Sequence, residues 1–310
     1  MTDTAPKHTT LAGYFITLTG AILFSTKAIF VKLAFNHTKV DAVTLLTLRM
    51  LFSLPFYLVA AWLGSKKESI NAITAKQWFY ILLMGFLGYY LSSLFDFIGL
   101  QYISAGLERL ILFLYPTFAI LINTFIFKSK LSRLQIIALL LTYTGIGIAY
   151  FGELRIDTFN KEFYFGSFMV FLCAVTYSVY LVGTGRIVPK VGVTRYTAYA
   201  MLAATVGIFV HFIATRSIGA VVFTPTLVGY TIALAIIATV LPSFMISNGM
   251  KKIGSNNVVI ITSIGPVSTI IQAHFVLGEP IFTEQVIGTL LVLIGVLMIG
   301  RKAKEETAKL

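Results

Sequence analysis

The sequence predicts an all-α integral membrane protein of ten transmembrane helices, arranged as two five-helix repeats of inverted topology. Hydrophobic residues make up 57% of the 310-residue chain and charged residues only 12%, against about 25% in soluble domains. A soluble core could not bury so many apolar side chains. The apolar segments have helical length and lack the alternating pattern of membrane barrels, so helices are expected to cross the bilayer.

An internal duplication relates the two halves of the chain at an offset of 150 residues. The segment 99–145 aligns without a gap with 249–295, and the aligned positions include identical Gly, Pro and Gln residues. The first helices of the two halves align more weakly, 12–25 with 165–178. These alignments pair four serines that we consider as site candidates: Ser25 with Ser178, and Ser93 with Ser243.

Ten apolar segments predict the helices, and several are close to the roughly 20 residues that span a bilayer. The most polar connection in the middle of the chain is 152–162, GELRIDTFNKE. We expect it to be an external loop between a first repeat, 1–151, and a second repeat, 163–310. The expected helices cover 11–34, 43–63, 77–99, 104–127, 134–151, 163–184, 197–214, 227–250, 254–277 and 284–300.

Charges in the connecting loops predict the orientation. Sixteen Lys and Arg residues fall on the side that holds both termini, and four fall on the other side. Because cytoplasmic loops carry the Lys/Arg excess, we expect both termini in the cytoplasm and the chain in the inner (plasma) membrane. The same loops account for the net charge of +12, so a nucleic-acid partner is not expected.

Five helices in each repeat make the second repeat enter the membrane from the opposite side. Inverted repeats of this kind are common in secondary transporters, whose substrate sites lie between the repeats near the middle of the membrane. The expected partners are therefore the lipid bilayer and a small-molecule substrate held in one central cavity.

Two passages resemble the EamA family of the drug/metabolite transporter superfamily. They read FDFIGLQYISAGLERLILFLYP and LGEPIFTEQVIGTLLVLIGVLMIG. The resemblance implies a ten-helix inner-membrane carrier, often an exporter of amino acids or related metabolites. The first repeat departs from the family pattern, because Ser129 stands where the second repeat has Glu279. The positions that carry the resemblance are the turn Ser104–Ala105, Pro116, Pro266, the pair Gly278–Glu279, and Arg49.

Six ionisable residues lie within the expected helices, and such residues are costly in a bilayer and are functional candidates by default. All six fall in the outer half of the membrane, and none has a charged counterpart in the second repeat. They are Lys27, Lys32, Arg49, Asp96, Glu108 and Arg109.

Lys27 and Glu108 each have two interpretations. Lys27 either forms a salt bridge with Asp96 or Glu108, or receives an anionic group of the substrate. Glu108 is either a cavity carboxylate, on one helix stripe with Tyr115, or a buried ion-pair partner.

The other three cations are expected to have structural roles. Arg49 is interpreted as a partner of Asp96 or of a backbone carbonyl. Arg109 lies on a different face of its helix from Glu108. Lys32 is expected to extend to the lipid headgroups at the outer boundary.

Secondary transport of a small polar metabolite, most simply an amino acid moved outward by alternating access, is the function that we expect. Asp96 and Glu108 are the carboxylates within the expected helices, so a coupling proton would bind there. No His/Cys cluster, nucleophile motif or phosphate loop is present in the sequence, so no metal, cofactor or enzymatic activity is expected. The alternatives are an exchanger of anions or phosphorylated metabolites, and a membrane subunit that does not transport.

Overall fold

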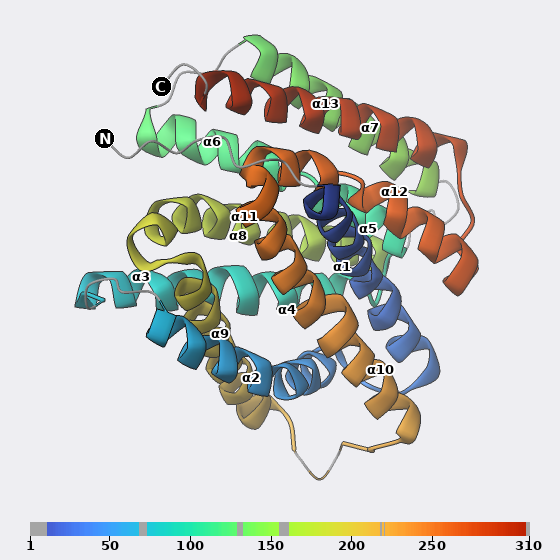
Figure 1. Ribbon diagram of the computed structural model, residues 1–310. Helices are drawn as coiled ribbons and strands as arrows, with labels where there is room; N and C mark the ends of the chain where they lie inside the picture. The colour runs from blue at the N-terminus through green and yellow to red at the C-terminus, as the bar shows by residue number, and fades with distance from the viewer. Residues whose placement is uncertain are drawn as a thin grey trace.

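The computed structural model describes residues 11–67, 73–128, 133–154, 161–217, 219 and 221–307. Within those ranges the chain forms helices and short connections, and no β-strand. Figure 1 shows long helices packed into one bundle, with α7 and α13 side by side along one edge.

The first half of the chain forms long helices that are interrupted at two places. Its elements are α1 (Leu11–His37), α2 (Ala42–Lys67), α3 (Ala75–Gly85), the π-helical segment η1 (Phe86–Leu91), α4 (Ser92–Gly99), α5 (Ala105–Leu112), α6 (Tyr115–Phe127) and α7 (Arg133–Leu154).

The second half repeats this pattern of long and interrupted helices. Its elements are α8 (Lys161–Val191), α9 (Val193–Thr215), α10 (Pro225–Ala235), the π-helical segment η3 (Ile236–Val240), α11 (Leu241–Thr262), α12 (Gly265–Gln272), the π-helical segment η4 (Ala273–Leu277) and α13 (Thr283–Thr307).

Residues at helix starts explain several of these boundaries. Ser104 caps α5, and its hydroxyl accepts a hydrogen bond from the Leu107 amide at 3.0 Å. Pro116 and Pro266 stand in the first turns of α6 and α12, where a missing amide hydrogen breaks no helical bond. The predicted small-residue turn and the two helix prolines are therefore helix-start signals.

The expected helix limits differ from the observed ones mainly in three ways. The segments expected as single helices over 104–127 and 254–277 are broken at 113–114 and 263–264, directly before the two first-turn prolines. The break expected just after 250 is absent, because α11 continues through Thr262. The expected loop 152–162 is shorter, since α7 reaches Leu154 and α8 begins at Lys161, and 155–160 lies outside the described residues.

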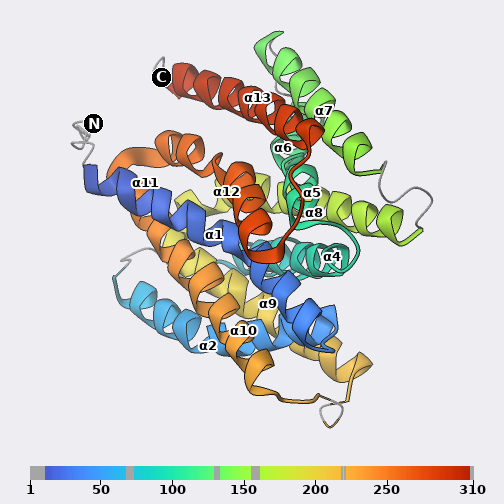
Figure 2. The ribbon, with the colours of Figure 1, turned by 90° about the vertical axis from the view of Figure 1, so that its right-hand side faces the viewer.

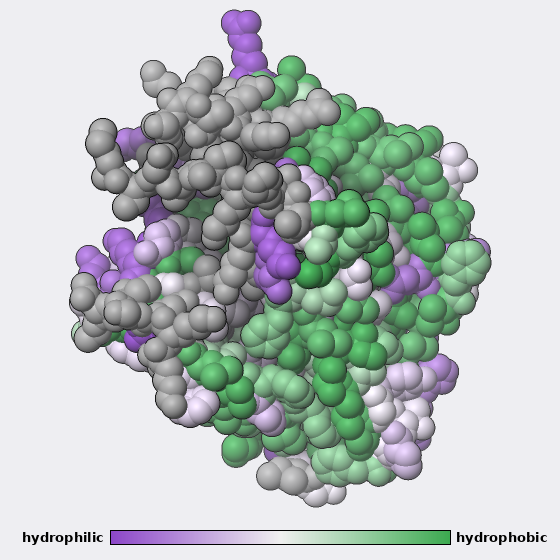
Figure 3. Space-filling model, viewed as in Figure 1, coloured by the Kyte–Doolittle hydropathy of each residue, from purple (hydrophilic) through white to green (hydrophobic). Residues whose placement is uncertain are grey.

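The outer surface of the bundle is apolar. Large hydrophobic side chains are exposed on many helices, among them Phe15, Trp62, Phe79 and Leu140. Hydrophobic residues dominate the described part of the face in Figure 3. Nine described helical stretches are long and apolar enough to cross a bilayer, and Thr283–Met298 is a shorter apolar helix. An apolar surface of this kind is suited to contact with lipid tails. The helices also satisfy their own backbone hydrogen bonds, as a lipid environment requires.

The closest helix packing joins α7 to α13, which lie alongside each other in both ribbon views (Figure 2). Gly145 and Gly288 face each other here, so a Cβ atom on either would collide with the carbonyl oxygen of the other. Small residues at such crossings let two backbones approach within the membrane. In Figure 2 the start of α1 and the end of α13 point to the same side of the bundle.

Candidate functional site

Lys27 and Asp96 form a buried ion pair between α1 and α4. The Lys27 ammonium lies 2.7 Å from a carboxylate oxygen of Asp96, and the two side chains are 12% and 1% exposed. The helices bring together two residues that are 69 positions apart in the sequence. The salt-bridge interpretation of Lys27 therefore describes the closed arrangement of this structure.

Glu108 and Arg109, on α5, extend this cluster. The Arg109 Nε atom lies 3.9 Å from a Glu108 carboxylate oxygen, and the same Nε donates to the Thr269 hydroxyl on α12 at 3.1 Å. The Arg109 guanidinium also lies 5.9 Å from the ring centre of Phe24. Both side chains are buried, although they are neighbours on one helix, because α1 and α12 pack against α5.

The carboxyl groups of Asp96 and Glu108 are neighbours in this cluster, and a hydrogen bond between them requires that one of them carries a proton. The Asp96 carboxylate accepts from the Lys27 ammonium, whereas neither oxygen of Glu108 has a hydrogen-bond donor. Two adjacent buried carboxylates repel each other, and the neighbouring cations Lys27 and Arg109 offset that repulsion. The charged or titratable groups around the pair are Lys27, Arg49, Arg109 and Cys173.

Arg49, on α2, has different partners from those expected. Its Nη2 atom donates to the Ser93 hydroxyl on α4 at 3.1 Å, and its guanidinium lies 5.0 Å from the ring centre of Phe97. Among the described residues Arg49 forms no ion pair with Asp96 and no bond to a carbonyl; Asp96 is close enough to act on the charge of Arg49, but its ion pair is with Lys27. Arg49 is only 4% exposed.

The remaining serine candidates satisfy carbonyls of their own helices. Ser25 donates to the Ala21 carbonyl at 2.9 Å and approaches the Gly265 carbonyl at 3.3 Å. Ser178 and Ser243 donate to carbonyls three and four residues earlier, at 2.6 Å each. A bond of this kind leaves the hydroxyl oxygen able to accept one more hydrogen bond.

Tyrosines from three helices form an aromatic wall that the sequence interpretation covered only at Tyr115. The Tyr115 ring meets Tyr177 edge to face at a centroid distance of 5.3 Å, and Tyr177 stacks on Tyr180 at 5.7 Å. The Tyr180 hydroxyl donates to the Tyr89 hydroxyl at 2.7 Å. Continued by two residues, the alignment of 12–25 with 165–178 pairs Lys27 with Tyr180, and that pairing is the sequence signal that could have drawn attention to this wall.

Two charged side chains bind backbone groups near the start of α5, at the end of the bundle where α1 finishes: Lys32 and Glu279. Lys32 does not extend to the headgroups as expected, because its ammonium donates to the Ile103 carbonyl at 2.8 Å. The Glu279 carboxylate accepts from the Ala105 amide at 3.0 and 3.1 Å, at the start of α5. Glu153 lies near both groups, in the last turn of α7, so the expected helices missed a third carboxylate.

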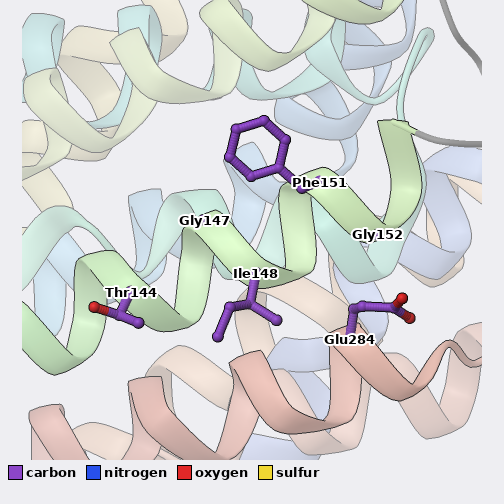
Figure 4. A pocket seen from close by; sticks show the side chains of 6 residues that line it. All are labelled: Thr144, Gly147, Ile148, Phe151, Gly152 and Glu284. Atoms are coloured by element: carbon purple, nitrogen blue, oxygen red, sulfur yellow. The ribbon is translucent and has the colours of Figure 1, made fainter.

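Two surface grooves lie away from the cluster of Lys27, Asp96, Glu108 and Arg109. One runs along α7 and α13, where Figure 4 shows Phe151 and Glu284 on either side of Gly152. The other lies between α1, α11 and α13. Asp96, Glu108 and Arg109 are almost fully buried, and we call this arrangement closed. Among the described residues no group of His, Cys, Asp and Glu is arranged to hold a metal ion.

The comparisons with known proteins agree on the kind of protein. The model of the EamA-like transporter family matches residues 11–151 and 164–301. The uncharacterized transporter YcbK of Bacillus subtilis (strain 168) is 29% identical over 294 residues, covering 89% of each chain. The uncharacterized transporter YyaM of the same organism is 28% identical over 238 residues, covering 76% of this chain and 75% of its own.

A solved structure shows the same fold. A protein of known crystal structure matches 94% of this chain and 98% of its own, with a TM-score of 0.66 and 19% sequence identity. The family match extends over most of the chain and includes both passages on which the resemblance was noted. The chain belongs to the EamA-like transporter family.

Proposed function

We propose that this protein is a secondary transporter that moves a small polar metabolite, such as an amino acid, out of the cell by alternating access. The observation that carries the proposal is the buried cluster of Lys27, Asp96, Glu108 and Arg109 inside a lipid-facing bundle. Ionisable groups held in that position are costly, and they mark substrate and proton pathways in membrane proteins.

Shared local features support two inverted repeats around this cluster. The π-helical segments η1 and η3 begin 150 residues apart, at Phe86 and Ile236. The breaks at 113–114 and 263–264, each followed by a proline, have the same spacing. Irregular helices that recur at matching positions of two halves are typical of transporter binding sites.

The helix contacts also support this relation: in a two-fold arrangement, each contact between a helix of the first half and one of the second has a counterpart with the halves interchanged. The contact of α1 with α11 corresponds to that of α8 with α4, and α2–α9 and α7–α13 are pairs of counterparts. Two units related in this way can rock against each other around a fixed site, which is the motion that we assign to transport. The first unit is 1–151 and the second is 163–310.

The carboxyl pair Asp96–Glu108 is our candidate for the coupling-proton site, with Lys27 as its counter-ion. When the pair holds one proton, its net charge is balanced by Lys27. Arg109, which lies 3.9 Å from Glu108, is then without a compensating anion, and loss of the proton restores the balance of two carboxylates and two cations. Binding and release of the proton would therefore favour different arrangements of the cluster. Ser25, Ser178 and Tyr115 remain proposed contacts of the substrate.

Solute flux tests the proposal. Purified protein in liposomes should accumulate at least one solute from a panel of amino acids, nucleosides and organic acids when a pH gradient is applied. Liposomes with the Glu108→Gln variant should lose the dependence on the gradient, while Glu162→Gln, at the exposed start of α8, should keep it. If no solute of the panel moves through the wild type, the chain is a membrane subunit that does not transport these compounds.

A further inference from the structure

Arg49 is a buried cation without an ion-pair partner in the described part of the chain. Its guanidinium is 4% exposed, and it contacts a neutral hydroxyl and an aromatic ring. Its Nε atom has no hydrogen-bond acceptor. Arginine keeps its charge even when it is buried, and an isolated charge in a membrane helix is costly. The closest candidate for a counter-ion, Asp96, is already paired with Lys27 at 2.7 Å.

A second orphaned polar atom lies next to this guanidinium. Tyr57 stands eight residues after Arg49 on α2, which places both side chains on the same face of the helix. It is 2% exposed, and its hydroxyl approaches that of Ser243 without making a well-aligned hydrogen bond. Buried hydroxyls without partners are uncommon, so two neighbouring donors lack an acceptor in the closed structure.

The hydroxyls around Arg49 come from equivalent places in the two halves. Ser93 and Ser243 are 150 residues apart, and each lies shortly after a π-helical segment, η1 or η3. α2 contacts α4, which carries Ser93, and η3, which ends three residues before Ser243. A π-helical turn shifts the helix face that follows it, and such turns occur frequently at functional sites. The serines therefore flank Arg49 and Tyr57 from the two sides of the proposed two-fold relation.

We propose that Arg49, Tyr57, Ser93 and Ser243 form a subsite that binds the carboxylate of the transported solute. This inference rests on the proposed transport function and assigns one part of its site. Guanidinium binds carboxylate through two parallel hydrogen bonds, and the Nε atom of Arg49 has no partner that would prevent it from making one of them. The bound carboxylate supplies the missing acceptor and the missing negative charge together.

The charge of the subsite favours a carboxylate over a phosphate. One arginine and three neutral hydroxyls balance a single negative charge, whereas a phosphate ester carries up to two. Lys27 would have to leave Asp96 to add a second cation. Because the four side chains are packed closely in the closed structure, we assign the bound carboxylate to the open states of the transport cycle.

Thermal unfolding without any ligand gives the first test. Arg49→Met replaces an unpaired cation by an apolar side chain of similar length, so the melting temperature of the purified protein should stay the same or rise. Lys27→Met is the matched comparison, because it strands Asp96 without its cation and should lower the melting temperature. A decrease in Arg49→Met as large as that in Lys27→Met would overturn the inference, since Arg49 would then have a structural anion.

Ligand binding gives the second test. The panel consists of the twenty amino acids, their carboxamides, and inorganic phosphate, each added to wild type, Arg49→Met and Ser93→Ala protein in a thermal-shift titration. At least one amino acid should raise the melting temperature of wild type, its carboxamide should not, and Arg49→Met should weaken the binding at least tenfold. The surface variant Arg216→Gln should bind as wild type does.

The failures of the two proposals are distinguishable. Equal binding of an amino acid and its carboxamide, or tight binding by Arg49→Met, overturns the carboxylate subsite whether or not solute flux is observed. A response to phosphate alone also overturns it and favours the anion-exchanger alternative. If carboxylate binding depends on Arg49 but liposomes show no flux, the subsite stands and the transport proposal fails.

Discussion

Lys27 and Arg49 are both cations inside the membrane, but only Lys27 has an anion within ion-pair distance in the described structure. Breaking a buried pair by removing one member is strongly destabilising, because the other member stays buried and charged. Removing both members, in contrast, removes the cost of burying them. Substitution of Lys27 and substitution of Arg49 should therefore change the stability of the protein in different ways.

A double-mutant cycle tests the Lys27–Asp96 pair. We expect Lys27→Met alone to lower the free energy of unfolding by about 3–5 kcal/mol, because Asp96 is left without its cation. Adding Asp96→Asn should recover most of that loss. Denaturation in detergent measures both values, and equal losses in the single and double variants would show that the pair does not stabilise the fold.

Asp41 provides a pH-dependent contribution outside the membrane-spanning helices. Partial burial raises the pKa of Asp41, but hydrogen bonds from Thr44 and the guanidinium of Arg216 outweigh burial and hold this pKa below its ordinary value. A lowered pKa stabilises the folded state above the unfolded value of about 3.9, and the contribution disappears as the pH falls through the folded pKa. Between about pH 5 and pH 3, wild type should therefore lose more stability than Asp41→Asn does. Parallel melting curves for the two proteins would contradict this assignment.

At the residue scale, the sequence could predict which side chains are costly but not which of them meet. Charge within an apolar run identified Lys27, Asp96, Glu108 and Arg109, and the salt bridge from Lys27 was one of two open interpretations. The Arg49–Ser93 bond was not predicted, because it depends on how α2 packs against α4. Tyr57 was missed because one tyrosine in an apolar helix gives no periodic signal.

Among the elements, α5 is the one whose position depends most on charge. Its first amide is held by the Glu279 carboxylate at 3.0 and 3.1 Å, and Ser104 caps the same end. Gly278 precedes that glutamate with a positive φ of 72°, a conformation that favours glycine and turns the chain toward α5. This end of α5 is one turn from the charged pair Glu108–Arg109.

Glu279→Gln tests the role of this contact. The neutral amide loses the favourable interaction of a carboxylate with a helix start, so the free energy of unfolding should fall by about 1–2 kcal/mol. Glu162→Gln also removes a carboxylate from a helix start, but in the exposed first turn of α8, where solvent screens the charge, so it should lower the free energy of unfolding by less, about 0.3–0.5 kcal/mol. If the two variants have the same stability, Glu279 does not hold α5 in place.

Most helices were predictable because the bilayer imposes both their length and their apolar composition. The breaks at 113–114 and 263–264 were not predicted, because apolar residues continue across them and hide the change of direction. The prolines that follow were noted, but a proline is equally compatible with a kink inside one helix. The continuation of α11 past 250 was missed for the opposite reason, since the polar residues that follow 250 were interpreted as a loop.

For the whole molecule, the proposed orientation places both termini in the cytoplasm. We expect cysteines substituted at Lys67 and Lys304 to resist an impermeant thiol reagent in intact cells, because lysine-rich loops stay inside. A cysteine at Lys161, at the start of α8, should react. The natural Cys173 is buried, so it should give no background. Labelling at Lys67 or Lys304 would contradict the orientation.

Proton movement coupled to solute movement tests the account most directly. Liposomes that contain the purified protein and a pH-sensitive dye are mixed with the solute identified by the flux screen, and the internal pH is recorded. We predict that wild type moves protons only when the solute is present, and that Glu108→Gln and Asp96→Asn move none although both remain folded in the membrane. Unchanged proton movement in both variants, or solute flux without any proton movement in wild type, would contradict the assignment of the buried carboxyl pair.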